Sequence, residues 1–177
     1  RHAGRCMAHT QGRSVTNLRI GLGEDAHRTA KGGPLRIGGV DVPHDRRLQG
    51  HSDADVLLHA ATDALLGAAG LPDIGQMFPN TDQANRGRDS AEMLQQAYAA
   101  VAQAGYRLVN LDCVVSAQRP KLSPYKQAIV ERIAAILGVP ASQINMKAKT
   151  GEGAGPVGRE ETIEAQVVAL VERVESG

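Results

Sequence analysis

Two short polar segments contain residues whose types and spacing suit metal chemistry. In the first, Asp25 and His27 lie two residues apart, so an extended strand places both side chains on one face. In the second, His59 follows Asp55 by four residues, which is the spacing of one helical face. One carboxylate and two imidazoles make a good ligand set for zinc, and three protein ligands leave a fourth position open, as in catalytic sites. The sequence therefore predicts a catalytic zinc site.

The alternative is that these histidines are ordinary surface or core residues, since the chain contains 6 of them. Clustering favours the metal. The acidic and imidazole side chains gathered between residues 25 and 63 are Asp25, His27, His51, Asp53, Asp55, His59 and Asp63. Asp63 follows His59 by four residues, where its carboxylate either accepts the other N–H of that imidazole and fixes its tautomer or is simply solvated.

Length and composition restrict the class of protein. A chain of 177 residues and 18.7 kDa is most simply one domain with a substantial core. Its net charge is +1 and it contains no basic block, which argues against nucleic-acid binding. Aromatic residues make up only 2%, so stacking platforms for single strands are also lacking, and the core must be aliphatic.

The cysteines and the apolar runs indicate the compartment. Cys6 and Cys113 are far apart and predict no disulfide framework, which favours a reducing environment such as the cytoplasm. No apolar run approaches the length of a membrane span, and the N-terminus lacks the apolar region of a signal peptide. Residues 1–18 are polar and aperiodic, and we expect a flexible extension before a single catalytic domain at 19–177.

Strands and helices alternate along the chain. Apolar runs and period-two alternation predict strands over 18–22, 35–42, 108–117, 144–149 and 163–171, and for the last segment a helix is the alternative. Capping and turn residues predict three helices, which begin at Ser52, Asp89 and Ser123 and end near Gly70, Gly105 and Gly138. Residues 71–82 are rich in Pro, Gly and Asp and predict a long loop.

This order favours a two-layer α/β or α+β domain, a mixed sheet with helices packed on one face. Val109, Leu111, Cys113 and Val115 are expected on one face of their strand. The second face of the last strands is aliphatic, which predicts burial against another subunit.

Two loops carry further candidate chemistry. Residues 117–123 join a strand to a helix N-terminus, where free N–H groups, the helix dipole and Lys121 suit a phosphate; the alternative is an ordinary loop with a solvated lysine. Residues 147–153 contain two lysines, Thr150 and Glu152, with Arg159 beyond them as a possible clamp. One carboxylate near phosphates suggests a divalent cation between them, the alternative being a polar glycine-rich turn.

Together these motifs resemble the 2-C-methyl-D-erythritol 2,4-cyclodiphosphate synthase family. The resemblance rests on Arg-Ile-Gly-x-Gly-x-Asp-x-His and His-Ser-Asp-x-Asp-x-x-x-His, which begin at Arg19 and His51, and it covers residues 19–172. The other matching segments are 38–40, 62–68, 73–79, 120–121, 145–150 and 152–153.

The resemblance implies a homotrimeric α/β lyase of the non-mevalonate isoprenoid pathway. Such an enzyme converts 4-diphosphocytidyl-2-C-methyl-D-erythritol 2-phosphate to 2-C-methyl-D-erythritol 2,4-cyclodiphosphate and releases CMP. The resemblance places its active sites between adjacent subunits and implies zinc together with a second divalent cation, Mg²⁺ or Mn²⁺.

The resemblance also implies roles for individual residues. Asp25, His27 and His59 would bind zinc, His51 and Thr150 would stabilise the transition state, and Glu152 would hold the second cation between the α- and β-phosphates. The residues implied on the zinc and methylerythritol side of the substrate are Asp25, Ala26, His27, His51, Ser52, Asp73, Ile74, Gly75, Phe78, Pro79, Asn80, Thr81 and Asp82. Those implied on the cytidine and phosphate side are Ala117, Gln118, Arg119, Pro120, Lys121, Leu122, Ser123, Lys149, Gly151 and Arg159.

Several positions differ from the family pattern. Asn80 stands where an Asp is usual, and Gly151 stands where a Thr or Asn is usual. Pro156 replaces a large apolar residue, and residues 160–162, Glu-Glu-Thr, replace Gly-Glu-Gly. The resemblance implies an apolar trimer cavity with an arginine-lined site for isoprenoid diphosphates, and the last two differences argue against that secondary site here.

The chemistry of this reaction agrees with the residues present. The attacking 2-phosphate is already ionised, so the task is to hold two repelling phosphates together and neutralise charge, not to supply a strong base. Two other classes remain as alternatives: another metal-dependent phosphoesterase, which would release hydrolysed products, and a non-catalytic zinc-stabilised trimeric binding module, which would need a fourth protein ligand closing the site.

Overall fold

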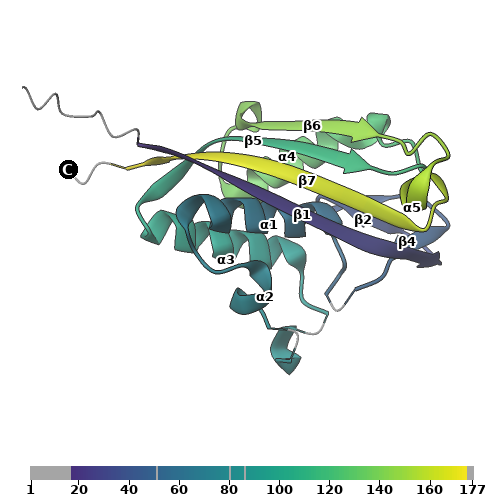
Figure 1. The fold of residues 1–177 in the computed structure, drawn as a ribbon, viewed down its shortest axis with the longest axis horizontal. Coiled ribbons are helices and arrows are strands. Elements are labelled where there is room, and N and C mark those ends of the chain that lie inside the picture. Colours follow the sequence, from purple (N-terminus) through teal and green to yellow (C-terminus); the bar gives the residue numbers. More distant parts are fainter. Residues whose placement is uncertain (1–16, 51, 80, 86, 175–177) are drawn as a thin grey trace, which may run out of the picture.

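A twisted sheet forms one layer of the molecule and three longer helices form the other (Figure 1). The computed structural model describes residues 17–50, 52–79, 81–85 and 87–174. The five-stranded sheet has the order β4-β1-β7-β5-β6, with β5 and β6 parallel and the other neighbours antiparallel. Its strands are β1 (Leu18–Lys31), β4 (Arg46–Leu48), β5 (Tyr106–Ser116), β6 (Ile144–Lys149) and β7 (Thr162–Arg173). A separate hairpin pairs β2 (Leu35–Ile37) with β3 (Val40–Val42).

The three longer helices cover one face of the sheet. Helix α1 packs on β1 and β7, α3 packs on α1 and β5, and α4 packs on β6 (Figure 1). These helices are α1 (Val56–Ala69), α3 (Ser90–Gln103) and α4 (Lys126–Leu137). The short helical elements are α2 (Ile74–Met77), α5 (Gly155–Gly158), η1 (Gln83–Asn85), η2 (Ser123–Tyr125) and η3 (Ala141–Gln143). The predicted mixed sheet with helices on one face is confirmed. Nowhere in the described ranges does a helix have the length and apolarity needed to span a bilayer.

Aliphatic side chains fill the space between the layers. Leu57 and Leu65 of α1, Leu111 of β5 and Val167 of β7 are all fully buried in this core. Cys113 is a buried free thiol, and burial raises its pKa to about 12. On the opposite face of the sheet Leu18, Ile20, Leu22 and Val168 are exposed, so the predicted burial of this face against another subunit stays a prediction.

Backbone pairing changes three of the predicted strands. The first was expected to end at residue 22, but β1 pairs with β7 as far as Arg28, because ladder hydrogen bonds hold polar residues as well as apolar ones. Residues 35–42 form two strands instead of one, since Gly38 and Gly39 both adopt positive φ and reverse the chain. A register shift between Leu108 and Asn110 buries Leu108 instead of Val109.

Helix starts also differ from the prediction. Asp55, and not Ser52, caps α1 by accepting a hydrogen bond from the N–H of Leu58 at 3.1 Å. Asp89 caps α3 as predicted. Ser123 begins the 3₁₀ turn η2 without a capping hydrogen bond, and α4 follows it. The predicted loop at 71–82 contains α2, which Asp73 caps. Most of the predicted extension, residues 1–16, lies outside the described residues, and Leu18 already belongs to β1.

Strand β1 and helix α1 approach so closely that two strand positions must be glycine. A Cβ atom on Gly21 would lie 2.0 Å from the carbonyl oxygen of Ala64, and one on Gly23 would lie 2.0 Å from that of Ala60. Alternate residues of a strand share a face, so Asp25 and His27 continue this row toward the same helix. The backbone contact therefore sets how far these two side chains lie from α1.

We predict that Gly23→Ala pushes β1 away from α1 and lowers the free energy of unfolding by about 1–3 kcal/mol or more, as overpacking does. The matched control is Gly67→Ala on the same helix. Nothing lies within 4 Å of a Cβ at Gly67, so the control should gain about 0.5–1 kcal/mol through helix propensity. Denaturant titration of both variants measures the difference, and a Gly23→Ala protein as stable as the parent would contradict the packing argument.

Candidate active site

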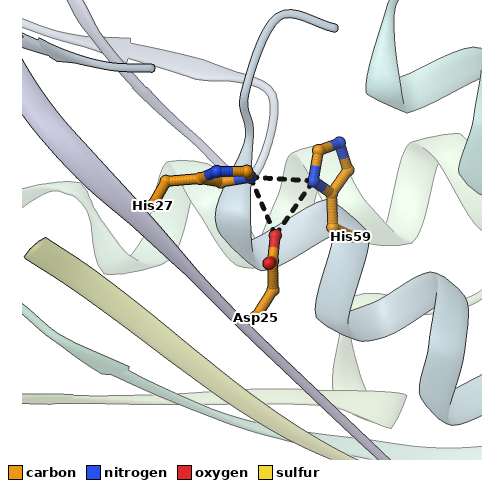
Figure 2. Close-up of side chains that lie close together, drawn as sticks. All are labelled: Asp25, His27 and His59. Carbon is orange, nitrogen blue, oxygen red and sulfur yellow. Dashed lines mark hydrogen bonds and ion pairs between the residues drawn. The ribbon is translucent and has the colours of Figure 1, made fainter. Parts of the chain in front are cut away.

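Asp25, His27 and His59 converge on one point between β1 and α1 (Figure 2). Asp25 Oδ2 lies 2.9 Å from His27 Nε2 and 3.0 Å from His59 Nδ1, and the two imidazole nitrogens are 3.1 Å apart. Three ligands at the corners of a zinc tetrahedron would be about 3.3 Å from each other, given metal–ligand bonds of about 2.0–2.1 Å. The triangle therefore has nearly the size that a tetrahedral ion requires, and the sequence prediction of this ligand set agrees with it.

Hydrogen bonds alone cannot make all three contacts of this triangle favourable. Two neutral imidazoles that both donate to Asp25 would point their N–H groups at each other across 3.1 Å. Only one donor is available per nitrogen and the carboxylate only accepts, so at least one of the three contacts is left unfavourable. A cation at the centre removes the conflict, because all three atoms then offer lone pairs to it. Burial raises the pKa of Asp25, but the hydrogen bonds and charges of His27 and His59 outweigh it, and the pKa lies well below its ordinary value.

A buried carboxylate anchors the helix that carries His59. Asp55 accepts hydrogen bonds from the N–H groups of Gly38 at 2.9 Å, Gly39 at 2.6 Å and Leu58 at 3.1 Å. It therefore joins the β2–β3 turn to the first turn of α1. Burial raises the pKa of Asp55, and these three N–H groups act in the opposite direction. Although Asp55 and His59 are one helical turn apart, only His59 faces the metal triangle, and Asp55 has a structural role.

The far side of the His59 ring contacts two hydroxyl groups. His59 Nε2 lies 2.8 Å from Ser90 Oγ and 3.0 Å from Ser52 Oγ. The proposal that Asp63 accepts from this imidazole is wrong, since the Asp63 carboxylate instead accepts the N–H of Ile74 at 2.7 Å and holds α2. The sequence reasoning missed Ser90, because Ser90 follows the Asp89 cap of another helix and no local spacing links it to His59.

A cavity of about 300 Å³ opens beside the triad. The predicted substrate residues that line it are His27, Ser52, Ile74, Gly75 and Phe78, together with the predicted metal ligand His59. Gly50, Asn85 and Met93 line it without having been predicted. Asn85 holds the loop by donating to the carbonyl of Pro79 at 2.9 Å, and the guanidinium of Arg88 lies 4.9 Å from the centre of the Phe78 ring.

Among the described residues, the others predicted on this side do not line the cavity. Asp73 caps α2, and Ala26 is exposed on β1. Thr81 and Asp82 are exposed after Pro79, next to the cavity loop. Two other predicted residues, His51 and Asn80, lie outside the described residues.

The predicted cytidine side comes together at the carboxyl ends of β5 and β6. The N–H of Ala117 donates to the carbonyl of Lys149 at 2.9 Å, and the side chain of Gln118 accepts from Gly153 at 3.4 Å. Thr150 Oγ1 accepts from the N–H of Glu152 at 3.4 Å. The loop continues through Pro120, Lys121, Leu122 and Ser123, of which Leu122 alone is buried.

Three features of this side bear on the differences from the family pattern. Gly151 has no room for a side chain, because a Cβ there would lie 2.4 Å from the nitrogen of Gly158. Arg119 forms an ion pair with Glu160 at 3.1 Å. Glu160 adopts a positive φ and stands at a position where the resemblance leads us to expect glycine. Arg159 pairs with Glu161 at 2.8 Å, so its guanidinium is already engaged with a carboxylate.

Within one chain the two sides of the predicted site lie at different strands of the sheet, three strand spacings apart. Ala26 of β1 pairs with Glu164 of β7, which pairs with Ser116 of β5, which pairs with Lys149 of β6. Adjacent strands are about 4.8 Å apart, so these three steps place Lys149 about 14 Å from Ala26. The metal triad and the cytidine side therefore lie in one row of the sheet but not in contact.

Comparison with known proteins identifies the class. Residues 18–172 match the YgbB family model. The chain is 57% identical over 156 residues to 2-C-methyl-D-erythritol 2,4-cyclodiphosphate synthase of Bordetella petrii, covering 88% of this chain and 96% of that one. It is 50% identical over 154 residues to the synthase of Gemmatimonas aurantiaca, covering 87% and 93%. The chain therefore belongs to the YgbB family of 2-C-methyl-D-erythritol 2,4-cyclodiphosphate synthases.

Solved structures give the same result. A structure of 2C-methyl-D-erythritol-2,4-cyclodiphosphate synthase in a CDP-bound form matches with a TM-score of 0.80 and 39% identity, covering 87% of this chain and all of that one. A CDP complex of IspF from Plasmodium falciparum matches with a TM-score of 0.79 and 33% identity, covering 92% and 100%. The bifunctional IspDF from Campylobacter jejuni matches with a TM-score of 0.87 and 40% identity over 91% of this chain, which spans 44% of that larger protein.

We predict that His59→Ala loses bound zinc while the fold persists, because His59 lies beside the cavity and its removal opens no large void in the core. His44→Ala is the control, since His44 contacts Asp45 away from the triad and should leave zinc in place. Metal analysis of both purified variants, with circular dichroism to check the fold, measures the result. Full zinc occupancy in His59→Ala would remove His59 from the ligand set.

Proposed function

We propose that this chain converts 4-diphosphocytidyl-2-C-methyl-D-erythritol 2-phosphate to 2-C-methyl-D-erythritol 2,4-cyclodiphosphate and CMP, as a lyase of the non-mevalonate isoprenoid pathway. The observation that carries the proposal is the triangle of Asp25, His27 and His59, which is the right size for a tetrahedral ion and opens on a cavity. The names of relatives at 50–57% identity support the particular substrate. The cytoplasm is the proposed location.

The reaction asks the protein mainly to position phosphates and neutralise their charge. Zinc on the triad and Mg²⁺ or Mn²⁺ on Glu152 would act as Lewis acids toward the phosphate oxygens. Thr150 and His51 would hydrogen-bond the phosphoryl group as its negative charge redistributes. Backbone N–H groups near Lys121 and Lys149 would hold the diphosphate in line with the attacking 2-phosphate. In this scheme no side chain needs to act as a strong base, because the nucleophile is already an anion.

The cytidine side of the site is proposed at residues 117–123 and 149–152. Two solved relatives are described as CDP complexes, and CDP is a fragment of the proposed substrate. Residues 117–122 lie between β5 and η2 outside any helix or strand, and the backbone N–H groups of such a loop suit a nucleotide whose phosphates and base both accept hydrogen bonds. The methylerythritol side is proposed at the cavity that Ile74, Gly75 and Phe78 line.

A complete site is proposed to need two subunits of a homotrimer. The triad and the Lys149 end of β6 are about 14 Å apart across the sheet of one chain, which is too far for both to hold one diphosphate group. Leu18, Ile20, Leu22 and Val168 form an exposed apolar row on the face that the helices leave uncovered. Burying that row against neighbouring subunits would bring the cytidine side of one chain to the triad of the next.

We expect a single-turnover product assay to yield the cyclic diphosphate and CMP in equal amounts. Treatment with a chelator should abolish the reaction, and added Zn²⁺ with Mg²⁺ should restore it. Phosphorus NMR identifies the products. Inorganic phosphate or a hydrolysed nucleotide in place of the cyclic product would indicate a metal-dependent phosphoesterase, and the absence of any turnover would indicate a binding module; neither alternative is favoured by the relatives.

We predict that mixing inactive His59→Ala chains with inactive Glu152→Ala chains restores activity. In a cyclic trimer with shared sites, equimolar random exchange leaves about a quarter of the sites with both halves intact. Mixing His59→Ala with His27→Ala is the control and should restore nothing, since both changes affect the same half. If verified exchange of the first pair gives no activity, the metal and nucleotide groups come from one chain.

A further inference from the structure

We infer that the Asp53 carboxylate, acting through the Ser90 hydroxyl, selects the tautomer of His59 that presents Nδ1 to a metal ion. Asp53 and Ser90 are thus positioning residues for the metal site. The inference rests on the metal site proposed above and adds to it the groups that hold one of its ligands in a binding-competent state.

The two nitrogens of His59 have different surroundings. Nδ1 faces the triangle, 3.0 Å from Asp25 Oδ2 and 3.1 Å from His27 Nε2 (Figure 2). Nε2 faces the other way, toward the hydroxyls of Ser90 and Ser52. An imidazole binds a metal only through a nitrogen that carries no proton, so His59 must carry its proton on Nε2 in order to use Nδ1 as the ligand atom.

The hydrogen bonds behind Ser90 determine which way that proton points. Ser90 Oγ forms a short hydrogen bond with Asp53 Oδ1, and Asp53 Oδ2 accepts the backbone N–H of Ser90 at 3.1 Å. A carboxylate has no proton to donate, and a hydroxyl has only one. Ser90 therefore donates to Asp53 and can only accept from His59, which places the imidazole proton on Nε2.

The surroundings of Asp53 favour its role as acceptor. The guanidinium of Arg36 lies beside it, with Nε 3.5 Å from Asp53 Oδ2. That Nε is buried and makes no hydrogen bond among the described residues, so its contact with Asp53 is an ion pair. The N–H of Asp55 also donates to Asp53 Oδ1 at 3.2 Å. Every neighbour that these contacts give Asp53 donates a proton or carries a positive charge.

Ser52 does not fix the direction of its hydrogen bond with His59 Nε2. Its Oγ lies 3.0 Å from His59 Nε2 and accepts the N–H of Ala54 at 3.2 Å, and its contacts with described residues include no carboxylate. The Ser52 hydroxyl can therefore either donate to the imidazole or accept from it. Ser52 also lines the cavity, whereas Ser90 is fully buried. Only Ser90 is both enclosed and polarised, which makes it the residue that orients His59.

The main test is the zinc affinity of the full chain, measured by competition with a chromogenic chelator. We expect Ser90→Ala and Asp53→Asn each to lose roughly ten- to a hundredfold, as is usual for groups that orient a metal ligand. Asp53→Asn keeps the shape but can donate from its amide to Ser90, which would let the hydroxyl donate to Nε2 and favour the wrong tautomer.

Asp89→Asn is the matched control. Asp89 lies one residue from Ser90 and 3.9 Å from the same Arg36 guanidinium, and Asn is as good a helix cap as Asp. This control loses the same charge but has no contact with His59, so its zinc affinity should equal that of the parent. Ser52→Ala should lose less affinity than Ser90→Ala.

The tautomer itself supplies a second readout that a purely structural role would not change. Asp25→Ala removes the carboxylate that competes for the Nδ1 proton, so long-range ¹H–¹⁵N correlation spectra are recorded on metal-free, ¹⁵N-histidine-labelled chains that carry it. In that background His59 should be protonated on Nε2, both alone and together with Asp89→Asn. Asp53→Asn should show a shift toward protonation on Nδ1. Unchanged zinc affinity and an unchanged tautomer in Asp53→Asn would overturn the inference. A parent chain that binds no zinc would instead overturn the metal site on which the inference rests.

Discussion

The site depends first on the contact between the backbone of β1 and helix α1. Gly21 and Gly23 bring the strand against the carbonyls of Ala64 and Ala60, where a single methyl group would overlap with the helix. Asp25 and His27 follow on the same face of the strand, so this contact sets their distance from His59. A triangle with sides of about 3 Å tolerates little movement, and backbone packing is stiffer than any arrangement of side chains alone.

A second layer of polar contacts holds the helix and its histidine in place. Asp55 joins the first turn of α1 to the turn at Gly38 and Gly39, and Asp53 links the same segment to Ser90 on α3. Asp63 holds α2 and with it one wall of the cavity. Of the acidic residues clustered in this part of the sequence only Asp25 reaches the triangle, and the others position the elements around it. Polar residues near a metal site thus serve mostly as supports that keep a few ligands rigid.

The order of the strands explains why the site is proposed to need a partner. Asp25 and His27 of the triad are on β1, and the loops that suit the nucleotide follow β5 and β6, with β7 between them. The helices cover one face of this sheet, and the opposite face carries an apolar row that is exposed among the described residues. The proposed assembly through that face would cover the apolar row and bring the two sides of the proposed site together.

The sequence by itself determined the fold class, the family and the set of Asp25, His27 and His59 that converges as a possible metal site. Period-two alternation identified β5 and β7 because a strand exposes alternate residues to one core, and the Asp-x-His spacing indicated a shared face by the same geometry. Only the tertiary structure decided the contacts that join distant segments: the full length of β1, the bulge that buries Leu108, the Asp55 cap and the Ser90 contact with His59. Local spacing cannot predict these, because each depends on which strand or helix becomes a neighbour, and burial of the whole core decides that.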